Sequence, residues 1–411
     1  MRGHIRTRDS EDNGRSRLPL LVLATVMTLT ACTTGEIPRL PRTQAELVSA
    51  RNAGEAQSAA DNRALIARNV ARVKGEYDDY VAGRAANPPI FDLLILSGGG
   101  DWGAFGAGVL KGWGRVPSGP AARPIFDAVT GVSTGALIAP FAFLNDESSI
   151  DRIVELYRNP QPDWMRPRGL LAFLTGGASY ADTPGLERDI RAALDLTMMR
   201  QLVEAGKDGR VLAVNTSNLD FGEMRAWDLI AEAQRALETG NRERVYSILL
   251  ASAGIPGAFP PRMIDGNLYV DGAITGNVLY GARIPEADSF VTVWEHSYPG
   301  TPVPKIRYWL IFNNQRRPPP EVVQPEWTSV LPRSTFASTR TATVNSIRHL
   351  FALAEVSRLK QKADIEVRFM AVPDDWTPSK PGVFIKAVMN DLADMGERMG
   401  ADPSNWQTKS P

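Results

Sequence analysis

The chain has 411 residues, of which 43% are hydrophobic and 22% charged, and its formal net charge is zero. This composition is typical of a globular protein that is long enough for a large α/β domain with additions. The even charge balance and the presence of only three histidines argue against a nucleic-acid binder and a histidine-rich metal site, so neither partner is expected.

The N-terminus has the layout of a secretory leader, with arginines before an apolar stretch at residues 18–29 that is too short to span a bilayer comfortably. It closes on Leu29-Thr30-Ala31-Cys32, which resembles the lipobox of bacterial lipoproteins, and Cys32 is the single cysteine. The resemblance implies a signal peptide at 1–31 and a lipid anchor on Cys32. Thr33, where aspartate would indicate inner-membrane retention, implies the outer membrane of the cell envelope, facing the periplasm. A plain signal peptide or a misplaced start codon is the alternative.

Helical and strand-like segments alternate through the rest of the chain. Apolar residues at helical spacing predict a helix over 43–82, which we interpret as a spacer within the segment 32–89. FDLLIL (91–96) predicts a buried strand, followed by a glycine loop and a helix at 104–113. FDAVT (126–130) predicts a second strand, which leads into the helix ALIAPFAFL.

Further strands are predicted at RVLAVNTSNLD, SFVTVWEH, KIRYWLIF and DIEVRFMAV, with helices between 150 and 202, before Pro256 and at 383–399. Strands that alternate with helices predict an α/β fold in which helices cover both faces of a mostly parallel sheet. We place the main domain at 90–300 and a C-terminal α/β extension, packed on that domain, at 301–411.

Gly131-Val132-Ser133-Thr134-Gly135 fits the G-x-S-x-G pattern of a nucleophile elbow, and it lies between a predicted strand and a predicted helix. The pentapeptide alone is a weak signal, but this context favours a nucleophile. The candidate bases are His296, His349 and Asp271, which lies where a strand enters an Asp-Gly turn. The small and apolar residues of ASAGIPGAFPP would exclude water near Asp271 and raise its pKa.

The loop SGGGDWG (97–103) permits two interpretations, because Gly98, Gly100 and Gly103 fit the G-x-G-x-x-G turn of dinucleotide-binding folds while bare amides also suit an oxyanion. A dinucleotide requires an acidic residue about twenty positions on, at the end of the second strand. Asp127 precedes the apolar part of its strand, and an elbow serine ends it. We therefore expect no nucleotide and no other cofactor.

SGGGDWG, GVSTG and VDGA, in this order and joined by LLASAGIPGAFPPRMIDGNLYVDGAITGN, resemble the patatin-like phospholipase family over about residues 91–277. The resemblance implies a three-layer α/β/α fold that hydrolyses acyl esters of lipids with a Ser-Asp dyad, with no histidine, cofactor or metal. It implies that Ser133 is the nucleophile and Asp271 its base. The implied oxyanion-hole residues are Gly98, Gly99 and Gly100, and the other motif glycines are Gly103, Gly131, Gly135 and Gly272.

One residue departs from the family pattern: Trp102 stands where the family commonly carries a basic residue, so the role of that positive charge is open here. The expected substrate is a membrane lipid or another acyl ester. Two alternatives remain. One is an α/β-hydrolase-type esterase with Ser133, Asp271 and His296 or His349 as a triad. The other is a non-catalytic envelope lipoprotein that retains the scaffold.

Overall fold

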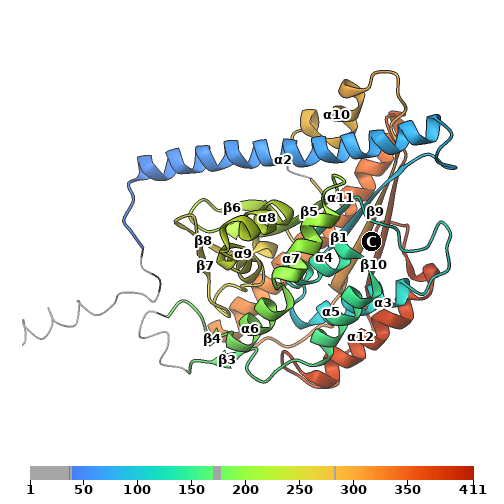
Figure 1. Ribbon diagram of the computed structural model, residues 1–411. Helices are drawn as coiled ribbons and strands as arrows, with labels where there is room; N and C mark the ends of the chain where they lie inside the picture. Colours follow the sequence, from blue (N-terminus) through green and yellow to red (C-terminus); the bar gives the residue numbers. More distant parts are fainter. Residues whose placement is uncertain (1–36, 38, 170–176, 282–283) are drawn as a thin grey trace, which may run out of the picture.

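An eight-stranded sheet with helices on both faces forms the centre of the protein (Figure 1). The computed structural model describes residues 37, 39–169, 177–281 and 284–411. The strands of the sheet are β1 (Ile90–Leu96), β2 (Ala128–Val132), β5 (Val211–Asn218), β6 (Glu223–Asp228), β7 (Arg262–Ile264), β8 (Asn267–Asp271), β9 (Lys305–Gln315) and β10 (Ile365–Val372). Their order is β10-β9-β1-β2-β5-β8-β7, and β6 pairs with β5 off this path.

Strands β10, β9, β1, β2 and β5 run parallel, whereas β6 and β8 pair antiparallel with β5 and β7 pairs antiparallel with β8. The two short strands β3 (Arg166–Pro167) and β4 (Ala181–Asp182) form a separate pair. The helices are α2 (Gln44–Val81), α3 (Gly103–Trp113), α4 (Thr134–Leu144), α5 (Glu147–Arg158), α6 (Pro184–Ala193), α7 (Leu196–Ala205), α8 (Leu229–Thr239), α9 (Glu243–Ser252), α10 (Phe290–Ser297), α11 (Trp327–Leu359) and α12 (Lys386–Gly400). The predicted three-layer α/β/α fold with a mostly parallel sheet is confirmed.

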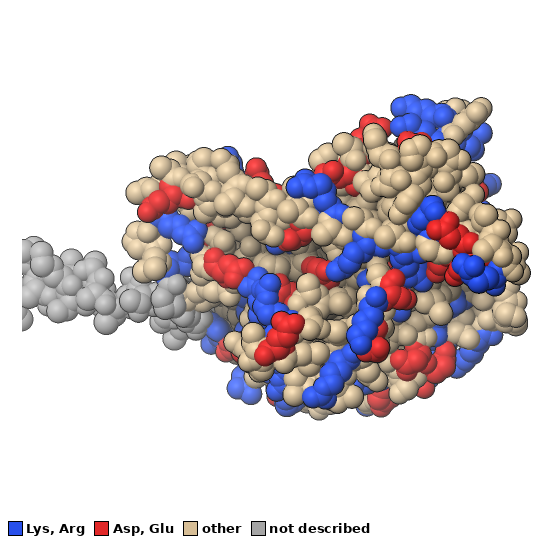
Figure 2. Space-filling model, turned by 45° about the horizontal axis from the view of Figure 1, so that its top comes forward, with Lys and Arg blue, Asp and Glu red and all other residues tan. Residues whose placement is uncertain are grey.

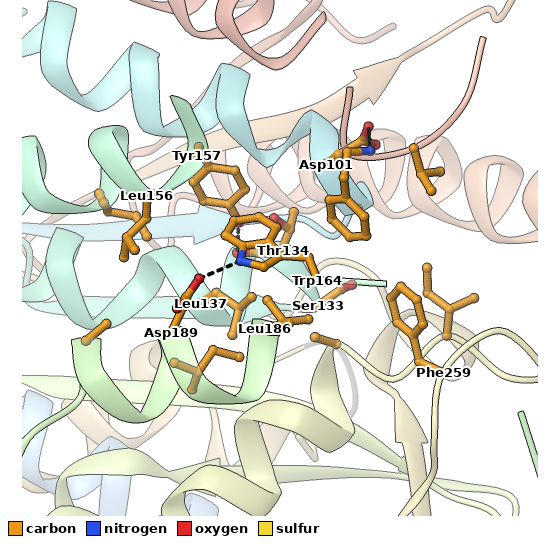
Figure 3. Close-up of a pocket in the computed structure, with 18 of the residues that line it drawn as sticks. Asp101, Ser133, Thr134, Leu137, Leu156, Tyr157, Trp164, Leu186, Asp189 and Phe259 are labelled. Carbon is orange, nitrogen blue, oxygen red and sulfur yellow. Dashed lines mark hydrogen bonds between the residues drawn. The ribbon is translucent and has the colours of Figure 1, made fainter. Parts of the chain in front are cut away.

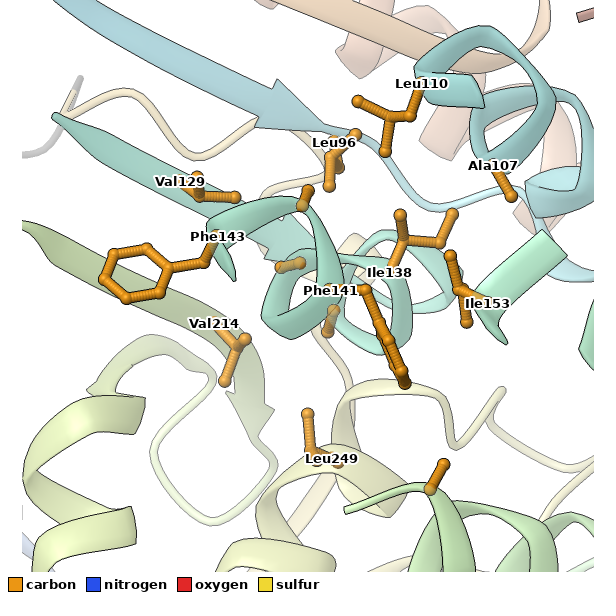
Figure 4. Packing of buried hydrophobic residues seen from close by; sticks show 14 of the residues in the cluster. Leu96, Ala107, Leu110, Val129, Ile138, Phe141, Phe143, Ile153, Val214 and Leu249 are labelled. Carbon is orange, nitrogen blue, oxygen red and sulfur yellow. The ribbon is translucent and has the colours of Figure 1, made fainter. Parts of the chain in front are cut away.

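Side chains of β1 alternate between two separate cores, as the two-residue period of a strand requires. Leu94 and Leu96 face the core built with α3, α4, α5, α7, α9 and α12, part of which Figure 4 shows around α4. Leu93 and Ile95 face the opposite core, built with α2, α10 and α11. Burial on both sides explains why β1 reads as a continuous apolar run.

The prediction of a strand at SFVTVWEH is wrong, because this segment forms α10. Ser289 caps the helix by accepting the N–H of Thr292. Phe290 and Trp294, four residues apart, stack on each other with ring centroids 6.0 Å apart, and Trp294 is fully buried. The same residues also satisfy strand alternation over a short window, so periodicity alone did not separate the two structures.

The helix predicted at 43–82 is confirmed as α2, and it lies along the body of the protein (Figure 1). Thr43 and Glu46 form a capping box at its start. Charged residues on the helix pair with the sheet region, as Arg68 does with Asp228 and Asp61 with Arg225. Basic and acidic side chains are interspersed on the face shown in Figure 2.

The C-terminal third contributes to the central sheet. Strand β9 lies between β1 and β10 and pairs with both in parallel register. Helix α12 packs closely on α3, where a Cβ at Gly108 would lie 2.2 Å from the carbonyl oxygen of Ala393. The boundary expected at residue 300 therefore falls within a region whose two sides share one sheet.

Cys32 and the leader lie outside the described residues, so the lipid anchor and the envelope location stay predictions. Among the helices that the structure describes, none is long and apolar enough to cross a membrane. No group of three His, Cys, Asp or Glu side chains within those residues is placed to hold a metal ion.

Candidate active site

Ser133 occupies a sharp turn between β2 and α4, as the elbow pattern predicts. Its φ of 54° and ψ of −125° lie in a sparsely populated region for a non-glycine residue, which costs on the order of 1–3 kcal/mol. The Ser133 N–H donates to Ser252 Oγ at 3.0 Å, and Ser252 Oγ donates to the carbonyl of Asn215 at 2.6 Å. The strained turn is thus held by hydrogen bonds from the neighbouring strand and helix.

The elbow requires glycines because other backbone atoms approach these positions closely. A Cβ at Gly135 would lie 2.2 Å from the carbonyl oxygen of Leu96. We expect Gly135→Ala to destabilise the fold by about 3 kcal/mol or more, because neither backbone can retreat. Gly75→Ala is the matched control: this helical glycine has nothing within 4 Å of a Cβ, and alanine should stabilise by about 0.5–1 kcal/mol. Urea unfolding measures both, and equal effects would contradict the argument.

The sheet register brings Asp271 to Ser133. Strand β5 lies between β2 and β8, Val132 pairs with Asn215, and Thr216 pairs with Asp271. Ser133, one residue after Val132, consequently lies beside the end of β8. Its Oγ donates to Asp271 Oδ2 at 2.6 Å, while Asp271 Oδ1 accepts the N–H of Ala273 at 2.8 Å.

Burial raises the pKa of Asp271 to about 7, although the hydrogen bonds from Ser133 and Ala273 act in the opposite direction. Only 3% of the residue is exposed, and Ser133 is 4% exposed. The carboxylate is therefore a much stronger base than a free aspartate and can accept a proton near neutral pH. The sequence predicted this shift from the small and apolar residues that precede Asp271.

The glycine loop lies directly against the elbow, since a Cβ at Gly98 would come within 2.9 Å of Ser133 Cβ. The Gly98 N–H, expected to face an oxyanion, instead donates to Asn277 Oδ1 at 2.7 Å. Among the residues that the structure describes, the N–H groups of Gly99 and Gly100 have no acceptor. Gly100 has a φ of +62°, which favours glycine.

A largely apolar pocket that is partly open to solvent begins at Ser133 and Gly100 (Figure 3). Side chains from α4, α5, α6 and the segment 253–259 form its walls. Leu137, Leu156, Leu186 and Phe259 point into it, and Trp164 lies across it with Nε1 donating to Asp189 Oδ2 at 2.6 Å. This pocket has the shape and chemistry to hold a hydrocarbon chain.

The remaining predicted site residues take structural positions. Gly103 and Gly272 approach neighbouring groups closely, with a Cβ at Gly103 only 2.0 Å from Thr134 Oγ1. Neither described histidine contacts the site: His349 Nδ1 bonds the Tyr280 hydroxyl, and His296 Nδ1 bonds the Thr292 carbonyl. Asp127 lies before β2, at the end of the strand opposite the elbow, where it pairs with Arg72.

Three supporting residues were missed by the sequence analysis: Asn215, Ser252 and Asn277. The Asn215 side chain donates to the carbonyls of Gly272 and Gly276, at 2.9 and 2.8 Å, and so holds the turn after Asp271. Asn277 donates to Thr343 Oγ1 at 2.9 Å while it binds Gly98. Ser252 and Asn277 both lie within the motif segment 249–277, and this position was the available signal for them.

The fold and the site together define a three-layer α/β protein whose elbow serine lies at the mouth of an apolar pocket. Residues 94–282 match the family described as patatin-like phospholipase, so the chain contains a patatin-like phospholipase domain, as its motifs predict. Members of this family are lipid acyl hydrolases, so the match supports hydrolase activity at the level of the family.

Among solved structures, the crystal structure of VipD from Legionella pneumophila is similar at 12% identity and a TM-score of 0.34, with 78% of this chain and 68% of that chain covered. A search of curated proteins gave no match.

Proposed function

We propose that the protein hydrolyses acyl esters of lipids, with Ser133 as nucleophile and Asp271 as its base. The observation that carries this proposal is the 2.6 Å hydrogen bond from Ser133 Oγ to Asp271 Oδ2 at the mouth of an apolar pocket. His296 and His349, the histidines that the structure describes, lie elsewhere, which disfavours a Ser-Asp-His triad. A scaffold without activity does not require a strained serine bonded to a buried aspartate.

In the first step, Asp271 takes the proton of the Ser133 hydroxyl while Oγ forms a bond to the carbonyl carbon of the ester. The resulting oxyanion accepts hydrogen bonds from the amides of Gly99 and Gly100, each worth typically about 2.7–4 kcal/mol. Collapse breaks the bond to the leaving alcohol, which receives the proton from Asp271. Water then attacks the acyl carbon and gives a proton to Asp271. Collapse breaks the bond between the acyl carbon and Ser133 Oγ, which takes the proton from Asp271, and the carboxylic acid leaves.

The substrate class follows from the pocket. Its walls are apolar, so a fatty acyl chain gains roughly 0.8 kcal/mol per buried CH₂. The polar part of the lipid lies outside this pocket in the proposed complex. Phospholipids and other acyl esters of lipids both satisfy these requirements.

The decisive experiment measures hydrolysis of p-nitrophenyl butyrate and of a fluorescent phospholipid, together with labelling by a fluorophosphonate probe. Wild type should turn over and label, and Ser133→Ala should do neither while it remains folded. His296→Ala and His349→Ala should retain turnover, since the dyad uses neither ring. Labelling without any hydrolysis, or loss of turnover in a histidine variant, would contradict the proposal.

The pH dependence follows from the raised pKa of Asp271. Since the base must be ionised, kcat/KM should fall about tenfold per pH unit below a pKa of about 7 and level off above it. Asp101, whose pKa burial raises to about 6, also lines the pocket. An unchanged pH profile in Asp101→Asn would assign the fall in kcat/KM at low pH to Asp271. A profile that shifts in this variant would assign the fall to Asp101.

A further inference from the structure

Two residues that directly follow the bare glycines contact a distant segment of the chain, residues 376–384. Asp101 and Trp102 belong to the short helix η1 (Gly100–Trp102). The Asp101 carboxylate accepts the N–H of Phe384 at 2.9 Å, and the Trp102 ring meets the Trp376 ring edge-on with centroids 4.8 Å apart. The glycine loop therefore holds this segment at both of its ends.

The Asp101 end of the segment forms part of the pocket wall. Val383 and Phe384 line the pocket that contains Ser133. The Phe384 ring lies against Trp164, with centroids 5.5 Å apart, and stacks on Phe259 at 6.2 Å. The ring thus completes an aromatic group on one side of the pocket.

The Trp376 end of the segment has two further hydrogen bonds, from Gln315 Nε2 to the Trp376 carbonyl at 2.6 Å and from Trp376 Nε1 to Asp391 Oδ2 at 2.8 Å. The stretch that leads from there to Phe384 is less well held. Phe384 has a φ of +57°, a conformation that bulky side chains rarely adopt, and Gly382 has a φ of +116°. Residues 377–382 are exposed. In the described structure, residues 377–383 form no hydrogen bond or ion pair. The strained turn at Phe384 persists only if its contacts fix it. Among these contacts, the hydrogen bond to the Asp101 carboxylate is the polar one.

The chemistry of Asp101 suits a fastening role. The residue is 7% exposed, so its carboxylate interacts with Phe384 in a water-poor site. Burial raises its pKa to about 6, so the ionised form, the better acceptor, prevails at neutral pH. Trp102, placed where the family commonly carries a basic residue, supplies the second attachment through Trp376.

We propose that Asp101 and Trp102 are positioning residues that fasten segment 376–384 as one wall of the pocket, and that the Phe384 ring on this wall sets the preference for long acyl chains. The inference rests on the proposed acyl hydrolase function and names the groups that select its substrate. With the wall in place, a long chain contacts Phe384 and is shielded from water. With the wall loosened, the pocket opens and that contact is lost.

The test compares kcat/KM for p-nitrophenyl dodecanoate and butyrate. Phe384→Ala should lower the dodecanoate-to-butyrate ratio about tenfold, through KM, and Asp101→Ala or Trp102→Ala about fivefold. Asp101→Asn keeps an oxygen acceptor and Trp102→Phe keeps a ring, so each should restore the ratio to within about twofold. Ser379→Ala, in the exposed middle of the segment, is the matched control with an unchanged ratio.

A double variant shows whether Asp101 acts through the wall. Asp101→Ala combined with Phe384→Ala should lower the ratio no further than Phe384→Ala alone, because the ring through which Asp101 acts is gone. Equal losses for both esters in Asp101→Ala would show an effect on the glycine loop alone and overturn the proposal. An unchanged or increased ratio in Phe384→Ala would also overturn it. If Asp101→Ala does not fold, Phe384→Ala and Trp102→Ala carry the test.

Binding in the absence of turnover separates this inference from the proposed function. In a Ser133→Ala background, cis-parinaric acid fluorescence should report binding that weakens about tenfold with Phe384→Ala and is unaffected by Ser379→Ala. Wild type that hydrolyses no ester would refute the proposed function while this binding pattern still supports the wall. If wild type hydrolyses the esters but Phe384→Ala does not change the binding of cis-parinaric acid, the proposed role of the wall is refuted and the proposed function is not.

Discussion

The Asp271→Asn variant should hydrolyse p-nitrophenyl butyrate at least about a thousandfold more slowly than wild type. An amide cannot take the proton of Ser133, yet it fits the same space: its oxygen accepts the Ala273 N–H, and its NH₂ donates to Ser133 Oγ. Combining this change with Ser133→Ala should cost little more than either alone, since the two residues act as a unit.

The control for this loss is Asp265→Asn, which makes the same chemical change in the hairpin that leads to Asp271. Asp265 pairs with Arg244 in an exposed ion pair, so its replacement should alter turnover less than about twofold. Substantial turnover in a folded Asp271→Asn variant would exclude Asp271 as the base. The site would then require another proton acceptor.

The same substitution should stabilise the protein at neutral pH. The pKa of Asp271 is raised in the folded state to about 7, so its stabilising contribution is complete below an unfolded pKa of about 3.9 and is lost as the pH rises through 7. Asparagine does not ionise, so the variant does not lose this stability as the pH rises. The advantage of Asp271→Asn in urea unfolding should grow between pH 4 and 7 by up to about 1.4 kcal/mol per pH unit. An advantage independent of pH would contradict the raised pKa.

The parts of the site that the sequence predicted are local. The elbow around Ser133 follows from a short pattern between a strand and a helix, because the backbone geometry is decided within five residues. Asp271 and its turn could be predicted for the same reason. The burial of Asp271 was predicted from the small and apolar residues that precede it in the sequence. These predictions needed no knowledge of which strands lie side by side.

The parts that the sequence did not predict depend on contacts between distant segments. The hydrogen bond from Gly98 to Asn277 spans 179 residues and redirects one of the three amides expected in the oxyanion hole. Phe384 joins the pocket across 283 residues from Asp101. Such pairings follow from sheet order and helix packing, which a single sequence with no repeat does not specify.

The place of the C-terminal third in the sheet leads to the second large effect: Asp92→Ala should destabilise the protein by about 3–5 kcal/mol. Asp92, on β1, accepts hydrogen bonds from Arg307 Nε, Arg307 Nη2 and Trp309 Nε1, each at 2.7 Å. Asp92 is 4% and Arg307 9% exposed. Removing the carboxylate leaves the guanidinium buried, with the carbonyl of Pro120 as its remaining acceptor.

Urea unfolding followed by tryptophan fluorescence and by circular dichroism measures this effect. Glu355→Ala, which breaks an exposed pair with Arg358, is the control and should cost less than about 1 kcal/mol. Replacing Asp92 by leucine and Arg307 by methionine together should recover part of the loss, because neither charge of this pair is then left buried alone, although Trp309 Nε1 loses its acceptor. Since Asp92 lies on the strand that feeds the glycine loop and Arg307 lies beyond residue 300, both probes should report one transition. Two transitions would mean that residues 301–411 unfold separately, which the pairing of β1 with β9 argues against.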